Sequence, residues 1–249
     1  MLEVKRSGGV VTVTMQRAPV NAFDPGFVGA WNDLIDTLEA DLPTVLHLRS
    51  AQKVFSAGAD LKMMRETFAR DDAAARMLVH VENMQKVFNR IEALGCVTVA
   101  EIAGAALGGG FELALACDIR IAGHGATLGL PETRIGLIPG AGGTQRLTRL
   151  CGPGIAKRII LGCDMVDGAT AERLGLVQWS RPDAELAAFA AETVARIAGL
   201  SRGALASSKR CIAAATDAID TGLLIERLET LQLFNQDDTR NRVRAFLER

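Results

Sequence analysis

Residues 97–122 read VTVAEIAGAALGGGFELALACDIRIA, and this stretch decides the fold class. The apolar run from Val97 to Ile102 predicts a strand, and the glycine-rich stretch from Gly104 to Gly110 predicts a turn. Phe111 to Ala116 then predicts a short apolar helix, and Ile119 to Ala122 a further strand. This order is typical of an α/β protein with mostly parallel strands.

The same alternation extends through the rest of the chain. Val10 to Met15 follows a Gly8-Gly9 turn, which predicts a hairpin, and Asp24-Pro25 is a helix start signal. The segment from Arg65 to Asp72 is polar, and its pattern leaves its structure open. Periodicity alone leaves open whether the strands form a doubly wound sheet or a coiled stack of ββα turns. Further apolar patterns predict a strand at Val45 to Leu48, a long helix through Met77, Val81, Met84, Phe88 and Ile91, and helices at Ala187 to Ile197, Ala204 to Ala215 and Leu223 to Phe234.

Composition excludes several classes of function. The chain has 249 residues, of which 49% are hydrophobic, and a net charge of −1, so it lacks the basic character of a nucleic-acid-binding protein. No apolar stretch is long enough to cross a bilayer, and the polar N-terminus is not typical of a signal peptide. Five cysteines without CxxC spacing favour a reducing compartment. We therefore expect a soluble, cytoplasmic protein.

The glycine triplet 108–110 is the first candidate for a functional site. Glycines immediately before a helix place main-chain N–H groups at the positive end of the helix dipole, where they can bind a phosphate or a developing oxyanion. A tight strand-to-helix turn is the commoner explanation of such a triplet alone. The triplet matches neither the dinucleotide fingerprint nor the P-loop pattern.

Two glutamates are the second candidate. Glu112 lies in an apolar run and Glu132 follows Pro131. A carboxyl group among apolar neighbours has either a partner or a shifted pKa, and two of them around one water can divide the roles of acid and base. Each one alone is more often a structural ion-pair residue. The sequence does not reveal whether the two meet in space.

Three motifs, taken together, resemble the enoyl-CoA hydratase/isomerase (crotonase) superfamily. They are Ser56-Ala57-Gly58-Ala59-Asp60-Leu61-Lys62, then Ala106 to Glu112 with Ala116-Cys117-Asp118-Ile119-Arg120, and Pro131-Glu132 with Pro139-Gly140-Ala141-Gly142-Gly143-Thr144-Gln145-Arg146-Leu147. The resemblance extends over nearly the whole chain. It implies a spiral of ββα turns at residues 1–190 and a C-terminal helical region at 191–249 that forms trimer contacts, with trimers pairing into hexamers.

The resemblance also implies a reaction and the residues that perform it. The chain would be a hydro-lyase that reversibly adds water across the 2,3 double bond of a 2-enoyl-CoA thioester in fatty acid metabolism, through an enolate. The amides of Ala59 and Gly109 would bind the thioester oxygen, Glu112 would activate the water, and Glu132 would deliver the proton to C2. The Gly140 amide would hold the water, and coenzyme A would contact Ala57, Ala59, Asp60, Leu61, Lys62 and Gly109.

Several alternatives remain open. Lys62 is as well explained by solvation as by a phosphate contact, and Met77 and Met84 fit either core packing or contacts with an acyl chain. Leu130 and Asn241-Arg242 depart from the pattern of short-chain hydratases, which leaves acyl length and branching open. His47, His80 and His124 form no metal-ligand pattern, so we expect no metal and no cofactor besides the coenzyme A of the substrate. An isomerase, a dehydratase, a thioester hydrolase or a non-catalytic CoA-binding protein are the competing functions.

Overall fold

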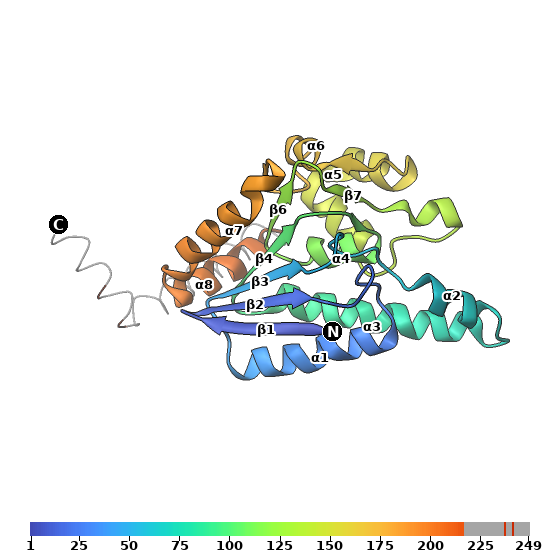
Figure 1. Ribbon diagram of the computed structural model, residues 1–249, viewed down its shortest axis with the longest axis horizontal. Coiled ribbons are helices and arrows are strands. Elements are labelled where there is room, and N and C mark those ends of the chain that lie inside the picture. Colours follow the sequence, from blue (N-terminus) through green and yellow to red (C-terminus); the bar gives the residue numbers. More distant parts are fainter. Residues whose placement is uncertain (217–236, 238–240, 242–249) are drawn as a thin grey trace.

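The computed structural model describes residues 1–216, 237 and 241, and its core is a six-stranded sheet (Figure 1). In sheet order the strands are β1 (Leu2–Ser7), β2 (Val10–Met15), β3 (Val45–Ser50), β4 (Val97–Ile102), β6 (Ile119–Gly123) and β9 (Trp179–Arg181). β1 and β2 form the predicted antiparallel hairpin, and every other neighbouring pair is parallel. The expected α/β class is therefore confirmed.

A second, three-stranded sheet resolves the question that periodicity left open. It contains β5 (Ala106–Leu107), β7 (Thr127–Gly129) and β8 (Val166–Asp167) in that order. Two successive turns of the chain each give one strand to the main sheet, one to the second sheet, and then a helix. These turns are β4-β5-α4 (α4, Gly109–Leu115) and β6-β7-α5 (α5, Gly143–Leu161). The chain is thus a coiled stack of ββα turns.

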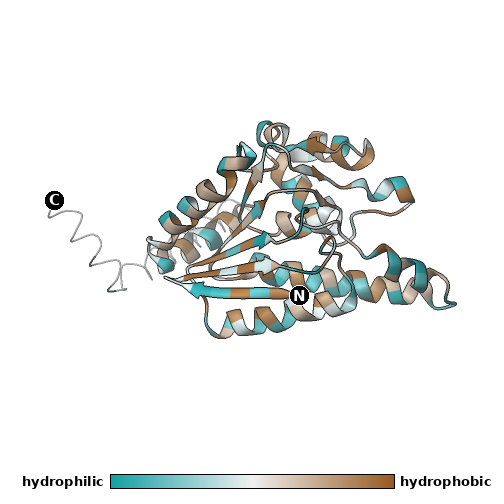
Figure 2. Cartoon of the chain, viewed as in Figure 1, coloured by the Kyte–Doolittle hydropathy of each residue, from teal (hydrophilic) through white to brown (hydrophobic). Residues whose placement is uncertain are grey.

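Helices cover both faces of the main sheet. On one face lies the larger core, where α1 (Pro25–Ala40), α3 (Ala73–Ala93), α4 and α5 pack. On the other face α7 (Asp183–Ala198) packs against Val45, Val97 and Val99. Figure 2 shows hydrophobic and hydrophilic residues alternating along α1, as expected for a helix with one buried side. The remaining elements are α2 (Leu61–Phe68), η1 (Pro131–Ile135), α6 (Gly168–Arg173), α8 (Arg202–Ala213) and η2 (Ala214–Thr216).

The first helix illustrates how closely local signals match the structure. The Asp24 carboxylate accepts from the amide of Phe27 at 2.8 Å, so the expected N-cap is present. The apolar face of α1 is buried, including Trp31 and Ile35. These contacts hold α1 against α3, which forms one wall of the site described below.

The structure also differs from the sequence expectations. The segment from Arg65 to Asp72 is partly helical, because α2 extends to Phe68. The short strands β5, β7, β8 and β9 were not expected, since two or three residues carry no measurable periodicity. The expected helix at Leu223 to Phe234 lies outside the described residues. The boundary expected between residues 190 and 191 lies within α7, and the division into two regions stays a prediction.

Candidate active site

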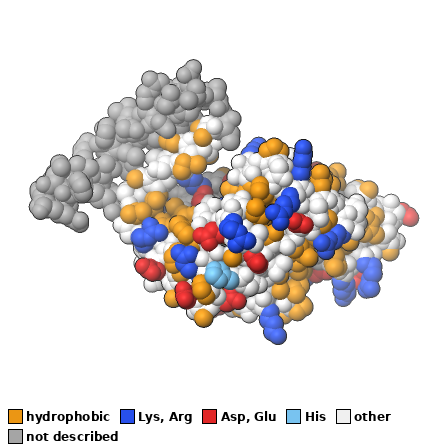
Figure 3. Space-filling view, turned by 90° about the horizontal axis from the view of Figure 1, so that it is seen from above, with side chains coloured by type: hydrophobic (Ala, Val, Ile, Leu, Met, Phe, Trp, Pro, Cys, Tyr) orange, Lys and Arg blue, Asp and Glu red, His pale blue; other side chains and the backbone are white. Residues whose placement is uncertain are grey.

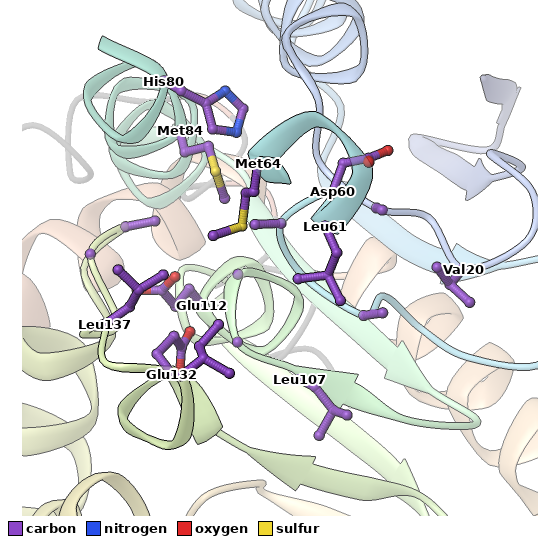
Figure 4. Close-up of a pocket in the computed structure, with 18 of the residues that line it drawn as sticks. Val20, Asp60, Leu61, Met64, His80, Met84, Leu107, Glu112, Glu132 and Leu137 are labelled. Carbon is purple, nitrogen blue, oxygen red and sulfur yellow. The ribbon is translucent and has the colours of Figure 1, made fainter. Parts of the chain in front are cut away.

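A cavity of about 670 Å³ opens between α2, α3, α4 and η1. Every residue that the sequence nominated lies on its wall, although the nominations came from segments up to 83 positions apart, between Ala57 and Gly140. Figure 4 shows the carboxyl groups of Glu112 and Glu132 next to each other at one end of this cavity. The structure thus brings the nominated residues together, while their individual roles stay predictions.

The amides of Ala59 and Gly109 lie side by side. A Cβ atom placed on Gly109 would lie 3.8 Å from the amide nitrogen of Ala59, and one placed on Gly58 would lie 2.9 Å from the nitrogen of Gly109. Gly109 is the first residue of α4, where a helical N–H has no partner within the helix. Neither amide has a hydrogen-bond acceptor among the described residues. Two free donors in one place are what binding of an oxyanion requires.

Glu112 is buried, and its carboxylate faces the start of α5. Only 2% of the residue is exposed, and its Oε1 accepts from the amide of Gly143 at 2.8 Å. Burial raises the pKa of Glu112 to about 7, and the charge of Glu132 acts in the same direction. The amides of Gly143 and Ala141 oppose this shift by favouring the ionised form. A carboxyl group with a pKa near neutrality is suited to exchange protons with water.

Glu132 enters the cavity from η1, directly after Pro131. Burial raises the pKa of its carboxyl group as well, and its Oε2 is buried with no hydrogen-bond partner in the described part of the chain. The other oxygen lies against Gly108, where an added Cβ atom would be only 2.8 Å from Oε1. Gly108 has a φ of 52°, in the left-handed region that favours glycine. The triplet therefore makes room for an acid as well as turning the chain.

The residues predicted to contact coenzyme A differ in their exposure and in the hydrogen bonds that they already make. Ala57 and Lys62 are exposed at the edge of the cavity. Leu61 is 70% exposed. The Asp60 carboxylate is already engaged, because it accepts from the amides of Lys62 and Met63, each at 3.0 Å, as the N-cap of α2. The Met63 amide and the ion pair with Arg17, at 2.9 Å, lower the pKa of Asp60. Asp60 thus shapes the loop that carries Ala59.

On the far wall the sequence singled out Met77 and Met84 but did not nominate Met64 or His80 as site residues. Met64 and His80 line the cavity from α2 and α3, with Met77, Val81 and Met84. Figure 4 shows Met84 and Met64 between His80 and the two glutamates. Met77 and Met84 line the cavity, and Met84 also belongs to the buried core, so contact with an acyl chain stays a prediction. His80 is 6% exposed, and burial lowers its pKa. Its spacing gave no signal, because one histidine on a helix face has many explanations.

The surface of the protein and the search for metal sites give little further information about its function. On the face seen in Figure 3, basic and acidic side chains are interspersed with hydrophobic ones. Within residues 1–216, 237 and 241 no cluster of His, Cys, Asp or Glu is arranged to hold a metal ion. No helix in the same part of the chain combines the length and apolar character needed to span a membrane.

Comparisons with known proteins identify relatives over the full length. Residues 5–249 match the model of the family described as enoyl-CoA hydratase/isomerase. A probable mitochondrial enoyl-CoA hydratase 2 of Arabidopsis thaliana is 36% identical over 97% of this chain and 80% of its own. The short-chain-enoyl-CoA hydratase of Clostridium acetobutylicum is 34% identical over 99% and 94%.

Solved structures show the same likeness. The structure of Pseudomonas aeruginosa DspI is 39% identical and matches with a TM-score of 0.91, covering 99% of this chain and 94% of that one. An enoyl-CoA hydratase of Geobacillus kaustophilus is 29% identical and has a TM-score of 0.94, with coverage of 99% and 93%. The spiral of ββα turns seen here is therefore shared with these proteins.

Proposed function

Because the chain belongs to the enoyl-CoA hydratase/isomerase family, we propose that it is an enoyl-CoA hydratase that acts through Glu112 and Glu132. The observation that carries this proposal is the arrangement of a buried and a half-buried carboxyl group beside two free main-chain amides in one cavity. Two acids are needed to divide water activation from proton delivery, and the amides are needed for a thioester oxygen.

In the proposed reaction the thioester oxygen accepts from the amides of Ala59 and Gly109. Ionised Glu112 takes a proton from water while the water oxygen forms a bond to C3. The electron pair of the double bond moves onto the thioester as an enolate, and Glu132 gives a proton to C2. Negative charge grows on the thioester oxygen during this step, so the two amides stabilise the transition state more than the substrate.

Other parts of the proposal rest on family membership and on surface features. We place coenzyme A at the mouth of the cavity along residues 57–62, with the Gly140 amide holding the water, and no separate cofactor. The exposed apolar residues Ile135, Ile138 and Leu161 are consistent with subunit contacts, and we expect a trimer or a hexamer. A light-scattering mass measurement tests this. We also propose a role in fatty acid metabolism, and a cytoplasmic location because the cysteine pattern favours a reducing compartment.

The test is a spectroscopic assay with a matched variant pair. Incubation with 2-enoyl-CoA thioesters of short, medium and branched chains should bleach the absorbance of the conjugated thioester. Glu112→Gln should lower kcat by about 100- to 10,000-fold, because a positioned general base contributes that much. Glu192→Gln, on the exposed side of α7, should leave kcat unchanged.

Two outcomes would contradict the proposal. Near-normal activity of Glu112→Gln on a 3-enoyl-CoA, with conjugated thioester appearing instead of disappearing, would identify an isomerase that needs one acid. Coenzyme A binding by calorimetry with no turnover of any thioester in the panel would identify a non-catalytic binding protein.

A further inference from the structure

The loop from Pro139 to Gly143 supplies the amide groups that lie against Glu112. Gly143 donates to Oε1 of Glu112 at 2.8 Å, and the Ala141 amide acts on the same carboxylate. For these N–H groups to face the cavity, the carbonyl groups of the loop must point elsewhere. The question is what holds them there.

Two side chains that do not line the cavity bind the outward carbonyl groups. Gln85 on α3 donates from Nε2 to the carbonyl oxygen of Gly140 at 2.6 Å. Arg146 on α5 donates from Nη1 to the carbonyl oxygen of Ala141 at 3.1 Å. The Gly140 carbonyl and the Ala141 N–H belong to one planar peptide group. A donor fixed on the oxygen therefore sets the direction of the N–H on the other side.

Arg146 is itself held firmly in place. It is 8% exposed, and Nε and Nη2 bond to Oε2 of Glu92 at 3.0 and 2.8 Å. Nη2 also donates to Oδ1 of Asn89 at 2.6 Å. A Cβ atom on Gly142, whose φ is 111°, would collide with Nη1, so the guanidinium group lies directly beneath the loop. Gln85, Asn89 and Glu92 share one face of α3 by their spacing.

We propose that Arg146 and Gln85 are positioning residues, which hold the 139–143 loop from α5 and α3 so that its amides face Glu112. Without them the Gly140 and Ala141 carbonyl groups lose their side-chain donors, and Glu112 loses the Ala141 amide that favours its ionised form. The Gly142 carbonyl group stays bonded to the amides of Gln145 and Arg146, so the Gly143 amide keeps its direction. The role assigned to Glu112 as a base rests on the proposed hydratase function, but the state of its carboxyl group is measurable without a substrate.

The charged groups around Glu112 determine how its pKa should change when Arg146 or Gln85 is replaced. The charged groups that act on it are Glu132 from η1 and Arg146 from α5. His80, on α3, lines the same cavity. Replacing Arg146 removes both a charge and a loop contact, whereas Gln85 is uncharged. A change at Gln85 therefore tests loop position alone.

The experiment compares Gln85→Met and Arg146→Met with two controls. Lys86→Met changes an exposed neighbour of Gln85 on α3, and Arg149→Met removes an exposed arginine on α5 without touching Arg146. Carbon-13 NMR titration of glutamate carboxyl groups in the free protein gives the pKa of Glu112, assigned by its loss in Glu112→Gln. The pH profile of kcat/KM reports the pKa of the same group in the free enzyme through its effect on activity.

We expect Gln85→Met to raise the pKa of Glu112 by about one unit, the equivalent of one hydrogen bond, and to move the acid limb of kcat/KM equally. Arg146→Met should raise it further, and both controls should leave it unchanged. A shift in Arg146→Met with none in Gln85→Met would show a charge effect without positioning and overturn the proposal. Lower melting temperatures with an unchanged pKa would assign both residues a merely structural role and overturn it too.

Two safeguards keep the outcome clear. If Arg146→Met does not fold, Gln85→Met decides alone, since its side chain is exposed and its loss leaves no buried cavity. A shifted NMR titration in a protein that turns over no enoyl-CoA would refute the hydratase function and leave the positioning role standing. Turnover with no shift in Gln85→Met would do the reverse.

Discussion

Burial of Glu112 disfavours the ionised form of its carboxyl group. Its pKa is raised to about 7 in the folded protein, above the 4.5 of a free glutamate. A folded-state pKa above the unfolded value means that the native state binds the proton more tightly. The stabilising contribution is therefore complete below about pH 4.5 and is lost as pH rises through about 7.

This sign leads to a prediction about stability. Glu112→Gln should increase the free energy of unfolding at pH 8 by about 3 kcal/mol at most, and should change it little at pH 5. Gln can still accept from the Gly143 amide, so the main change is the loss of the buried charge. Urea denaturation at the two pH values measures the difference. A variant that is less stable at pH 8 would show that Glu112 is better solvated than its burial indicates.

A second prediction at this scale concerns Gly108. A side chain here would adopt an unfavourable left-handed φ and would place Cβ 2.8 Å from Oε1 of Glu132. Gly108→Ala should displace this acid by about 1 Å and lower kcat about 100-fold, with a smaller change in KM. Gly29→Ala, in α1 with open space around its Cβ position, is the matched control and should keep full activity. Equal kinetics of the two variants would remove Glu132 from the reaction.

Among the elements, α2 depends most on its cap. It is eight residues long and buries only Met64, so packing contributes little to its stability. Asp60 bonds to the amides of Lys62 and Met63 and to Arg17. Asp60→Ala should cost α2 about 1 kcal/mol and speed hydrogen exchange at residues 62 and 63 about fivefold.

A matched variant separates the two roles of Asp60. Asparagine keeps an oxygen that can cap the helix but loses the ion pair with Arg17, so Asp60→Asn should give a smaller effect. Exchange in Asp60→Asn as fast as in Asp60→Ala would mean that the ion pair, rather than the cap, holds this end of α2. Mass spectrometry of deuterated peptides resolves the two cases.

The same element shows where sequence reasoning ends. The hairpin, α1, α3, β4 and α4 were predictable, because each carries an apolar period over six or more residues or a clear cap. α2 was not, because its single buried residue leaves no stripe to detect. The glutamates were nominated from local context and motif resemblance. The two glutamates come together because β4-β5-α4 and β6-β7-η1 pack as successive turns of the fold. No local sequence pattern predicts this packing. His80 and Met64 reach the cavity through the same tertiary arrangement.

At the scale of the whole molecule, the buried side chain of Arg120 connects the main sheet to α4 and to the segment before β9. It is 3% exposed and donates from Nε to the carbonyl of Leu176 at 2.9 Å, and from Nη1 to those of Cys117 and Ala114 at 2.6 and 3.2 Å. It thereby joins β6, the C-terminal end of α4 and the segment before β9. Burial lowers its pKa, because the guanidinium group is withdrawn from water.

Arg120→Met should therefore deprive the buried carbonyl groups of Leu176 and Cys117 of this donor, while the Ala114 carbonyl keeps the Cys117 amide, and should lower the free energy of unfolding by about 3 kcal/mol. Activity should fall in parallel as α4 loosens beneath Glu112. Arg149→Met, at an exposed position of α5, is the control and should be neutral. Calorimetric melting compares them. Equal melting temperatures would show that water replaces the guanidinium group without loss.

The cavity has two walls with different origins. One consists of α4, η1 and the loop before α5 and carries the acids, while the other comes from α2 and α3 and is lined by Met64, Met84 and His80. Substitutions at Met64 or His80 would reshape the second wall without replacing either acid. Under the proposed function, the space for the acyl chain and the acid pair are thus supplied largely by different elements, and α3 belongs to both because its Gln85 also bonds to the loop beside Glu112.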